Sequence, residues 1–236
     1  MSSAIGPAYL VQIALSVCLL MFSATLHEVA HGFVAHLCGD DTAKEAGRLT
    51  LNPAKHLDPV GSVVLPLIMA LAGQAVFAYA KPVPYNPWRL KRRKRDEVLV
   101  ALAGPASNLG LAALSAAAFR LVWGLVVARP ELLLAPEIPL VGETPVGLAL
   151  MVCANFTWVN LMLCFFNLIP LPPLDGSKVL CYFLEGEALQ SYYRVQHYAM
   201  PILIIALYIL PRLGLDPVGA YLDVCAGNVY SLLLGA

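Results

Sequence analysis

The sequence predicts an all-α polytopic membrane protein, and three observations predict it. Hydrophobic residues make up 59% of the 236 positions and charged residues only 13%, whereas about a quarter of a soluble domain is charged. Mean hydropathy is +0.73. Several apolar runs reach the length of about 20 residues that a helix needs to cross a bilayer. We expect about five to six apolar helical segments, with a short membrane-associated β or re-entrant region between the first two long helices.

The apolar runs define three long spans and some shorter segments. The first predicted helix covers residues 7–37, and Gly39 is suited to end it. A second span is predicted over residues 98–127 and a third over 146–168. The rest of the chain is less regular, with a short helix around 177–189, a further span over 198–210 and a weaker candidate over 218–234.

The stretch between the first two spans is polar and broken by proline. Residues 48–51 alternate like a short strand. Residues 60–80 are apolar, and their length fits either a full crossing or a segment that enters the membrane and returns. The basic run over residues 91–95 lies beside a span, which is typical of the cytoplasmic face rather than of a nucleic-acid site.

The most informative motif, His27-Glu28-Val29-Ala30-His31, lies inside the first predicted span. Two His four positions apart share one face of a helix. Both imidazoles can therefore bind one Zn²⁺, and the Glu28 carboxylate can act as general base toward water. Residues 9–26 before the motif carry no charge. Because ionisable groups are costly inside a membrane, these side chains are functional candidates.

A catalytic zinc site usually has three protein ligands and a water, so a third ligand is needed. Asp175 follows a proline cluster at the end of the third span, where the helix is broken and irregular backbone can line a cavity. Taken alone, Asp175 is better explained as the N-cap of the helix near Ser177. It can join His27 and His31 only if both parts lie near the same face of the bilayer.

The distribution of basic residues favours that arrangement. If residues 60–80 re-enter, the side that carries the motif holds twelve of the fifteen Lys and Arg and the remainder holds three; a full crossing gives nine and six. The positive-inside rule prefers the uneven split, which places the metal toward the cytoplasmic face. The twelve are Lys44, Arg48, Lys55, Lys81, Arg89, Lys91, Arg92, Arg93, Lys94, Arg95, Lys178 and Arg194, and the three are Arg120, Arg129 and Arg212.

The motifs together resemble the site-2 protease family of intramembrane zinc metalloproteases. The resemblance rests on His27-Glu28-x-x-His31, Gly104-Pro105-x-x-Asn108 and Asn167-x-x-Pro170-x-Pro172-x-x-Asp175-Gly176. A compact bacterial subgroup is indicated by Leu51-Asn52-Pro53 with His56, by Asp58-Pro59 and by Ala80-Lys81-Pro82-Val83-Pro84. The sequence departs from larger relatives in carrying no PDZ or CBS domain.

The resemblance implies a function and a place in the cell. His27, His31 and Asp175 bind one Zn²⁺ and Glu28 is the catalytic base. The substrate is a transmembrane protein, cut within or beside its transmembrane segment in regulated intramembrane proteolysis. The chain is expected to be one multi-pass domain of the cell membrane over residues 1–236, with a catalytic core of about 7–185 and C-terminal helices over about 190–236.

Candidates for substrate binding remain open. Asn108 either bonds substrate backbone or joins neighbouring helices, and Asn167 is a further candidate. His56 lies near the metal, gates the site or is a loop residue bonded to Asp58. An extended substrate could add to a strand edge offered by residues 49–51 or 83–85.

Two other functions are weighed against proteolysis. A metal-ion transporter would show several ligand pairs, often in repeated halves, and a catalytically silent membrane scaffold would lack a ligand or Glu28. The six Cys form no CxxC pair and fit small core residues. The expected partners are the substrate and the lipid bilayer, with no nucleic acid and no identified soluble partner domain.

Overall fold

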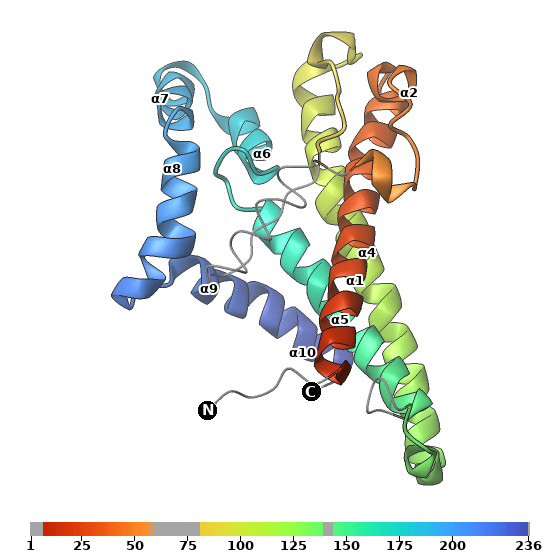
Figure 1. Ribbon diagram of the computed structural model, residues 1–236. Coiled ribbons are helices and arrows are strands. Elements are labelled where there is room, and N and C mark those ends of the chain that lie inside the picture. The colour runs from red at the N-terminus through yellow and green to blue at the C-terminus, as the bar shows by residue number, and fades with distance from the viewer. Residues whose placement is uncertain (1–6, 57, 59–80, 139–143, 236) are drawn as a thin grey trace.

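The computed structural model describes residues 7–56, 58, 81–138 and 144–235, and Figure 1 shows that part of the chain as an assembly of helices. Within these residues there is no β-strand. The predicted all-α fold is therefore confirmed. The segment at 60–80, for which re-entry was predicted, lies outside the described residues.

Among the described residues, three helices are long and apolar enough to cross a membrane: α1 (Pro7–Leu37), α4 (Arg93–Ala128) and α5 (Pro145–Asn167). They confirm the three predicted spans to within a few residues. The helix α4 has 36 residues, which at about 1.5 Å per residue is longer than the roughly 30 Å of a hydrocarbon core. Its charged first turns make the helix begin at Arg93, before the start of the span predicted at residue 98.

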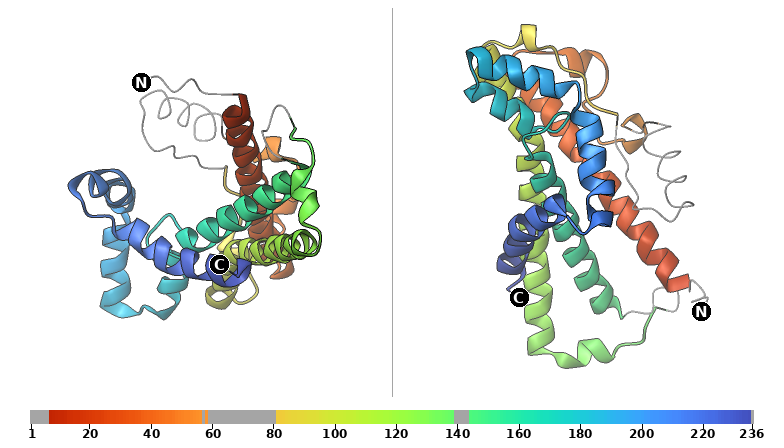
Figure 2. Two further views of the ribbon diagram at one scale, coloured as in Figure 1. Left: turned by 90° about the horizontal axis from the view of Figure 1, so that it is seen from below. Right: turned by 90° about the vertical axis from the view of Figure 1, so that its left-hand side faces the viewer.

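The long helices pack around α4, which contacts both α1 and α5. Because α1 and α5 run opposite to α4, the end of α1, the start of α4 and the end of α5 all point toward the same end of the molecule (Figure 1). The connection through η4 (Pro130–Leu134) lies at the other end, as Figure 2 also shows. The two halves of the predicted metal site are thereby brought to the same end.

Polarity in the bundle is inverted relative to a soluble protein. Asn108, Thr157 and Asn160 have no exposed surface, whereas Leu114 is 71% and Leu121 is 73% exposed. In water the large apolar residues would be inside. Lipid can cover this outer surface, while helices that pass through a membrane often bond through polar side chains between them.

Short elements form a corner at the end of α1. They are α2 (Thr42–Glu45), η1 (Pro53–Lys55) and η3 (Pro87–Arg89). Gly39, with φ 105°, follows α1 as predicted. The strand predicted over residues 48–51 is wrong: Thr50 N donates to Arg48 O at 3.0 Å, and this tight bend is incompatible with an extended strand.

The C-terminal part is more broken than predicted. The single helix expected around 177–189 is two helices, α6 (Gly176–Phe183) and α7 (Gly186–Gln196), because the chain is extended at Leu184 and turns at Gly186 with φ 55°. The apolar helix formed by α8 (Ala199–Ile204) and η5 (Ile205–Ile209) is shorter than a span. It ends before Pro211, where η6 (Pro211–Leu213) begins, so the span predicted for 198–210 is not confirmed.

The weaker candidate over residues 218–234 forms a helix in three parts that packs against α4 and α5. The parts are α9 (Pro217–Leu222), the π-helical η7 (Asp223–Gly227) and α10 (Asn228–Leu234). Arg120 of α4 closes its end by donating to the carbonyls of Leu232 and Leu233 at 2.7 and 2.6 Å. These bonds satisfy carbonyls that have no partner within the helix.

Candidate metal centre

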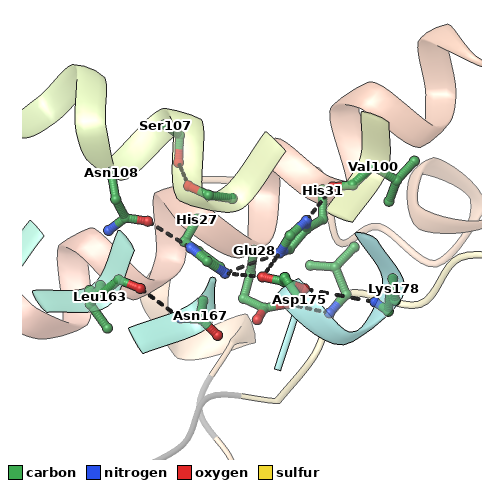
Figure 3. Close-up of polar contacts among 12 residues, drawn as sticks. His27, Glu28, His31, Val100, Ser107, Asn108, Leu163, Asn167, Asp175 and Lys178 are labelled. Carbon is green, nitrogen blue, oxygen red and sulfur yellow. Dashed lines mark hydrogen bonds and ion pairs between the residues drawn. The ribbon is translucent and has the colours of Figure 1, made fainter. Parts of the chain in front are cut away.

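Three side chains from distant parts of the chain meet at one point (Figure 3). His27 and His31 come from successive turns of α1, and Asp175 comes from the turn between α5 and α6. The two Nε2 atoms are 3.0 Å apart, and each lies 3.1 Å from Asp175 Oδ2. All three residues are buried. The structure thus brings together the three ligands predicted from the sequence.

The surroundings of Nδ1 in His31 show which of its two ring nitrogens carries the proton. Nδ1 lies 2.6 Å from the backbone carbonyl of Val100 on α4. A carbonyl can only accept, so Nδ1 of His31 donates its hydrogen there. The Nε2 atom of a neutral His31 is then left with a lone pair that points toward Asp175.

A chain of hydrogen bonds fixes His27 in the same way. Asn160 Nδ2 donates to Phe156 O at 2.8 Å, so Asn160 Oδ1 faces Asn108 and accepts from its Nδ2 at 3.0 Å. Asn108 Oδ1 must then accept from His27 Nδ1, which lies 2.6 Å away. The ring nitrogen that faces the centre, Nε2, again carries a lone pair.

The donor set therefore fits a metal ion. Two imidazole nitrogens and a carboxylate oxygen converge at 3.0–3.1 Å, an arrangement that is repulsive unless a metal ion or a proton lies between them. Ligands about 2.0–2.1 Å from a tetrahedral zinc are roughly 3.3 Å apart, close to these separations. Outer hydrogen bonds from ligating His to carbonyl groups are also usual at metal sites.

The glycine of the second motif allows α4 to approach the ligands. A Cβ atom on Gly104 would lie 2.5 Å from ring atoms of both His27 and His31. Real Cβ atoms do not come so close, so only glycine fits at this position. The motif Gly104-Pro105-x-x-Asn108 thus contributes to the centre in two ways. Gly104 allows α4 to approach the two His rings, and Asn108 bonds His27 Nδ1.

Asp175 occupies the N-cap position of α6, but its side chain makes no capping hydrogen bond. It points to the two His instead (Figure 3). Lys178 lies one turn further on α6, with its ammonium group 3.8 Å from Asp175 Oδ1. The carboxylate therefore has one oxygen toward the His side chains and the other toward a cation.

The predicted base, Glu28, is half-buried beside the ligand group (Figure 3). Its Oε2 accepts a hydrogen bond from Val83 N at 2.7 Å. Val83 belongs to residues 81–86, a segment that we call the strap. Backbone donors and acceptors such as Val83 N and Val100 O have no signal in the sequence, and neither was predicted from it.

The strap is fixed to the corner of α1 through Asp40. This carboxylate is fully buried and accepts from Thr42 N at 3.0 Å, Thr42 Oγ1 at 2.5 Å and Asn86 N at 2.5 Å. Burial raises the pKa of Asp40, but the hydrogen bonds from Thr42 and Asn86 outweigh it, so the pKa lies below its usual range.

The candidate substrate-binding residues lie in different surroundings. Asn108 is fully buried, and its amide is engaged by His27 and Asn160. Asn167 Nδ2 donates to Leu163 O of its own helix at 3.0 Å. His56 is buried, with Nε2 2.9 Å from Thr50 O. These bonds tie Asn167 and His56 to neighbouring backbone rather than to the metal ligands, and their substrate roles stay predictions.

Comparison with known proteins agrees with this geometry. The chain is 42% identical over 161 residues to YwhC of Bacillus subtilis strain 168, covering 68% of this chain. It is 30% identical over 200 residues to Rip2 of Mycobacterium tuberculosis H37Rv and 29% over 194 residues to Rip2 of Mycolicibacterium smegmatis, each covering 82% of this chain. These relatives are named zinc metalloproteases.

The chain spans 65–66% of the length of these curated relatives. No solved structure matches it. The metal that the relatives' names imply, zinc, is the one that the His-His-Asp donor set fits. A family model for peptidase family M50 matches residues 15–210. With this match over most of its length, the chain belongs to peptidase family M50, the site-2 protease family.

Proposed function

We propose that the protein is an intramembrane zinc metalloprotease that cleaves peptide bonds within or next to transmembrane segments of membrane proteins. One observation carries the proposal. His27, Glu28 and His31 lie on α1, a helix that is long and apolar enough to cross a membrane, and Asp175 from the turn before α6 completes the ligand group beside them. Such a site gives hydrolytic chemistry to a part of the protein that the bilayer surrounds.

The residues have distinct roles in the proposed reaction. His27, His31 and Asp175 hold the zinc ion, which when bound polarises a carbonyl group and lowers the pKa of water. Glu28 takes a proton from the attacking water as the water oxygen bonds to the carbonyl carbon of the substrate. Glu28 then returns this proton to the leaving nitrogen as the C–N bond breaks, which gives a carboxylic acid and an amine.

The substrate must present an unwound segment, because the carbonyl groups of a helix are bonded within the helix and shielded by side chains. The polar interior around Asn108 and Asn160 lies next to the ligands. We infer that a short extended stretch of the substrate reaches Glu28 from the end of the molecule that holds the strap. Cleavage of this kind fits regulated intramembrane proteolysis of a membrane-protein substrate.

The same end of the molecule is proposed to face the cytoplasm in a multi-pass protein. The basic residues 91–95 precede or begin α4 there, and basic clusters beside spans favour that side. Lys81 N donates to His56 O at 2.8 Å. The residues on either side of 57–80 are therefore adjacent, which supports a topology with both on one face.

A metal-ion transporter would need further ligand groups along a path. In the part of the chain that the structure describes, His27, His31 and Asp175 are the one group of three His, Cys, Asp or Glu side chains placed to hold a metal. The base Glu28 beside them favours hydrolysis over both a transporter and a silent scaffold.

The test is cleavage of a model transmembrane substrate by the protein in proteoliposomes. Glu28→Gln keeps the side chain's size and removes the base, so we expect activity to fall at least about a hundredfold, the usual contribution of a general base. A zinc chelator should abolish cleavage and added zinc should restore it. His36→Ala, on the same helix but paired with Asp41 outside the site, should keep activity.

The zinc content of Asp175→Ala tests the third ligand separately. Loss of one of three protein ligands should leave the purified variant with little metal. Full zinc content in this variant would return Asp175 to its position as a helix N-cap, and cleavage that survives both Glu28→Gln and chelation would show that the proposed function is wrong.

A further inference from the structure

The strap carries one backbone N–H at its centre, and this N–H faces the proposed base. In Pro82-Val83-Pro84 the two prolines have no N–H, so Val83 holds the only backbone donor of the three. It donates to Glu28 Oε2 at 2.7 Å. Hydrogen bonds to a carboxylate are stronger than those between neutral groups. The pattern of prolines thus leaves a single donor, and Glu28 accepts from it.

Both ends of the strap are bonded to the rest of the protein. At the start, Arg48 Nη2 donates to Lys81 O at 2.7 Å and Pro82 O at 3.4 Å. At the other end, Asn86 N donates to buried Asp40 Oδ2 at 2.5 Å. The N–H of Val83 is therefore held between two fixed points rather than at the tip of a free loop.

Packing against α1 sets how closely the strap approaches. The Val83 side chain is only 6% exposed. A Cβ atom on Gly32, one residue after His31, would lie 2.8 Å from Val83 Cγ1 and 2.8 Å from Leu49 Cδ2. The absence of a side chain at Gly32 lets the strap lie against α1 beside the motif.

We propose that the Val83 N–H is a positioning group for the general base. It holds Oε2 of Glu28, so that the other oxygen, Oε1, stays directed at the water and takes the proton. The inference rests on the proposed function, because it assigns Glu28 the role of base. Proline on both sides fixes φ and stiffens the backbone, which keeps the donor in place through the reaction.

The arrangement also limits how a substrate can pair with the strap. The Val83 N–H is already used by Glu28, and the carbonyls of Lys81 and Pro82 accept from Arg48. An extended substrate therefore finds no free N–H at Val83 and must bond other groups of the strap, such as the Val83 carbonyl. The strap's first part serves the enzyme's own base.

The test compares two substitutions at one position in the full-length, zinc-loaded protein. Val83→Pro removes the N–H, whereas Val83→Ala keeps it and shortens the side chain. For Val83→Pro we expect kcat to fall about tenfold to a hundredfold, as expected for a misplaced catalytic group, with KM and zinc content unchanged. Val83→Ala keeps the N–H but shortens a buried side chain, so it should lose clearly less kcat than Val83→Pro.

Because a third proline could disturb the strap, a second variant removes the N–H alone. Replacing Val83 by its α-hydroxy acid during cell-free synthesis into nanodiscs turns the amide into an ester and leaves the side chain intact. The same fall in kcat is expected. An ester variant with wild-type kcat, or an equal loss in Val83→Ala, would overturn the inference.

A measurement on metal-free protein is independent of activity. In ¹⁵N-valine NMR spectra, the Val83 amide proton should exchange slowly in the wild type and faster in Glu28→Ala, while Glu97→Ala should leave it unchanged. Equal exchange in wild type and Glu28→Ala would contradict the bond. If the wild type and Glu28→Gln cleave equally, the proposed function fails, and the exchange result still reports on the bond itself.

Discussion

Gly104 lies where α4 approaches the proposed metal ligands His27 and His31. A methyl group there would overlap ring atoms of His27 and His31. In Gly104→Ala the two helices must separate or the rings must turn, so we expect the purified protein to lose most of its zinc. Metal analysis after purification checks this.

Gly110 provides a matched control on the same helix. A Cβ atom at Gly110 would meet nothing within 4 Å. Alanine favours a helix by about 1 kcal/mol over glycine, so Gly110→Ala should hold its zinc and melt no lower than the wild type. Equal zinc content in both variants would show that the close approach at Gly104 is not required.

The amide of Asn108 orients His27 through Nδ1. Replacing an outer partner of a metal ligand typically costs about tenfold to a hundredfold in metal affinity, and we expect this loss in Asn108→Leu. Asn160→Leu should show a smaller loss in the same direction, because Asn108 then lacks its own anchor. Competition with a fluorescent zinc chelator gives the affinities.

Asn155 is the control for that pair. It lies on α5 like Asn160 and, among the described contacts, makes none with Asn108. Asn155→Leu should keep wild-type zinc affinity. If Asn108→Leu also keeps it, the hydrogen-bond chain from Phe156 to His27 does not contribute to metal binding.

At the scale of elements, the corner after α1 holds the strap in place. Asp40 joins α2 to the strap through Thr42 and Asn86, and its pKa is lowered. A lowered pKa means that this stabilisation is complete above the unfolded-state pKa, about 4. It is lost as the pH falls through the folded-state pKa.

Asp40→Asn should therefore destabilise the protein at neutral pH by about 2 kcal/mol, the value of strong bonds to a buried charge. The difference from the wild type should narrow as the pH drops below about 4. Thermal melting in detergent at several pH values measures this.

The control is Asp41→Asn, because the Asp41 side chain is 51% exposed and pairs with His36 at the surface. Exposed pairs contribute about 1 kcal/mol or less. A difference between Asp40→Asn and the wild type that stays constant down to low pH would show that the Asp40 charge is not what anchors the strap.

At the scale of the whole molecule, the polar residues inside and the apolar residues outside show that lipid is the expected surrounding. Exposed charged side chains lie at both ends of the bundle. Lys94 in α4 and Glu187 in α7 are exposed at the end that holds the site, and Glu131 in η4 is exposed at the opposite end.

Cysteine labelling tests the proposed orientation. In a background whose six native Cys are replaced, Lys94→Cys and Glu187→Cys should react only after the membrane is made permeable, whereas Glu131→Cys should react in intact cells. Any result that places positions 94 and 187 on opposite faces would contradict a shared face for the two parts of the site.

The sequence by itself determined the class of protein and the three spans, and it predicted His27 and His31 as a pair of metal ligands. Apolar runs set the spans because backbone groups in a membrane must be satisfied within a helix. The HExxH spacing predicted that His27 and His31 lie on one face of the helix, because four residues make about one helical turn. The short irregular elements were harder to predict from the sequence, because their ends depend on local hydrogen bonds such as that from Thr50 N to Arg48 O.

Only the tertiary structure shows which way the Asp175 side chain turns. From the sequence alone a helix cap was the better explanation, and the fold turns the carboxylate toward two imidazoles from about 150 residues earlier. It likewise decided that α4 supplies Val100 O and Asn108 to orient those rings, and that Val83 N reaches Glu28. These contacts join residues far apart in the chain, and backbone donors and acceptors are the same at every position, so no local pattern encodes which of them will meet.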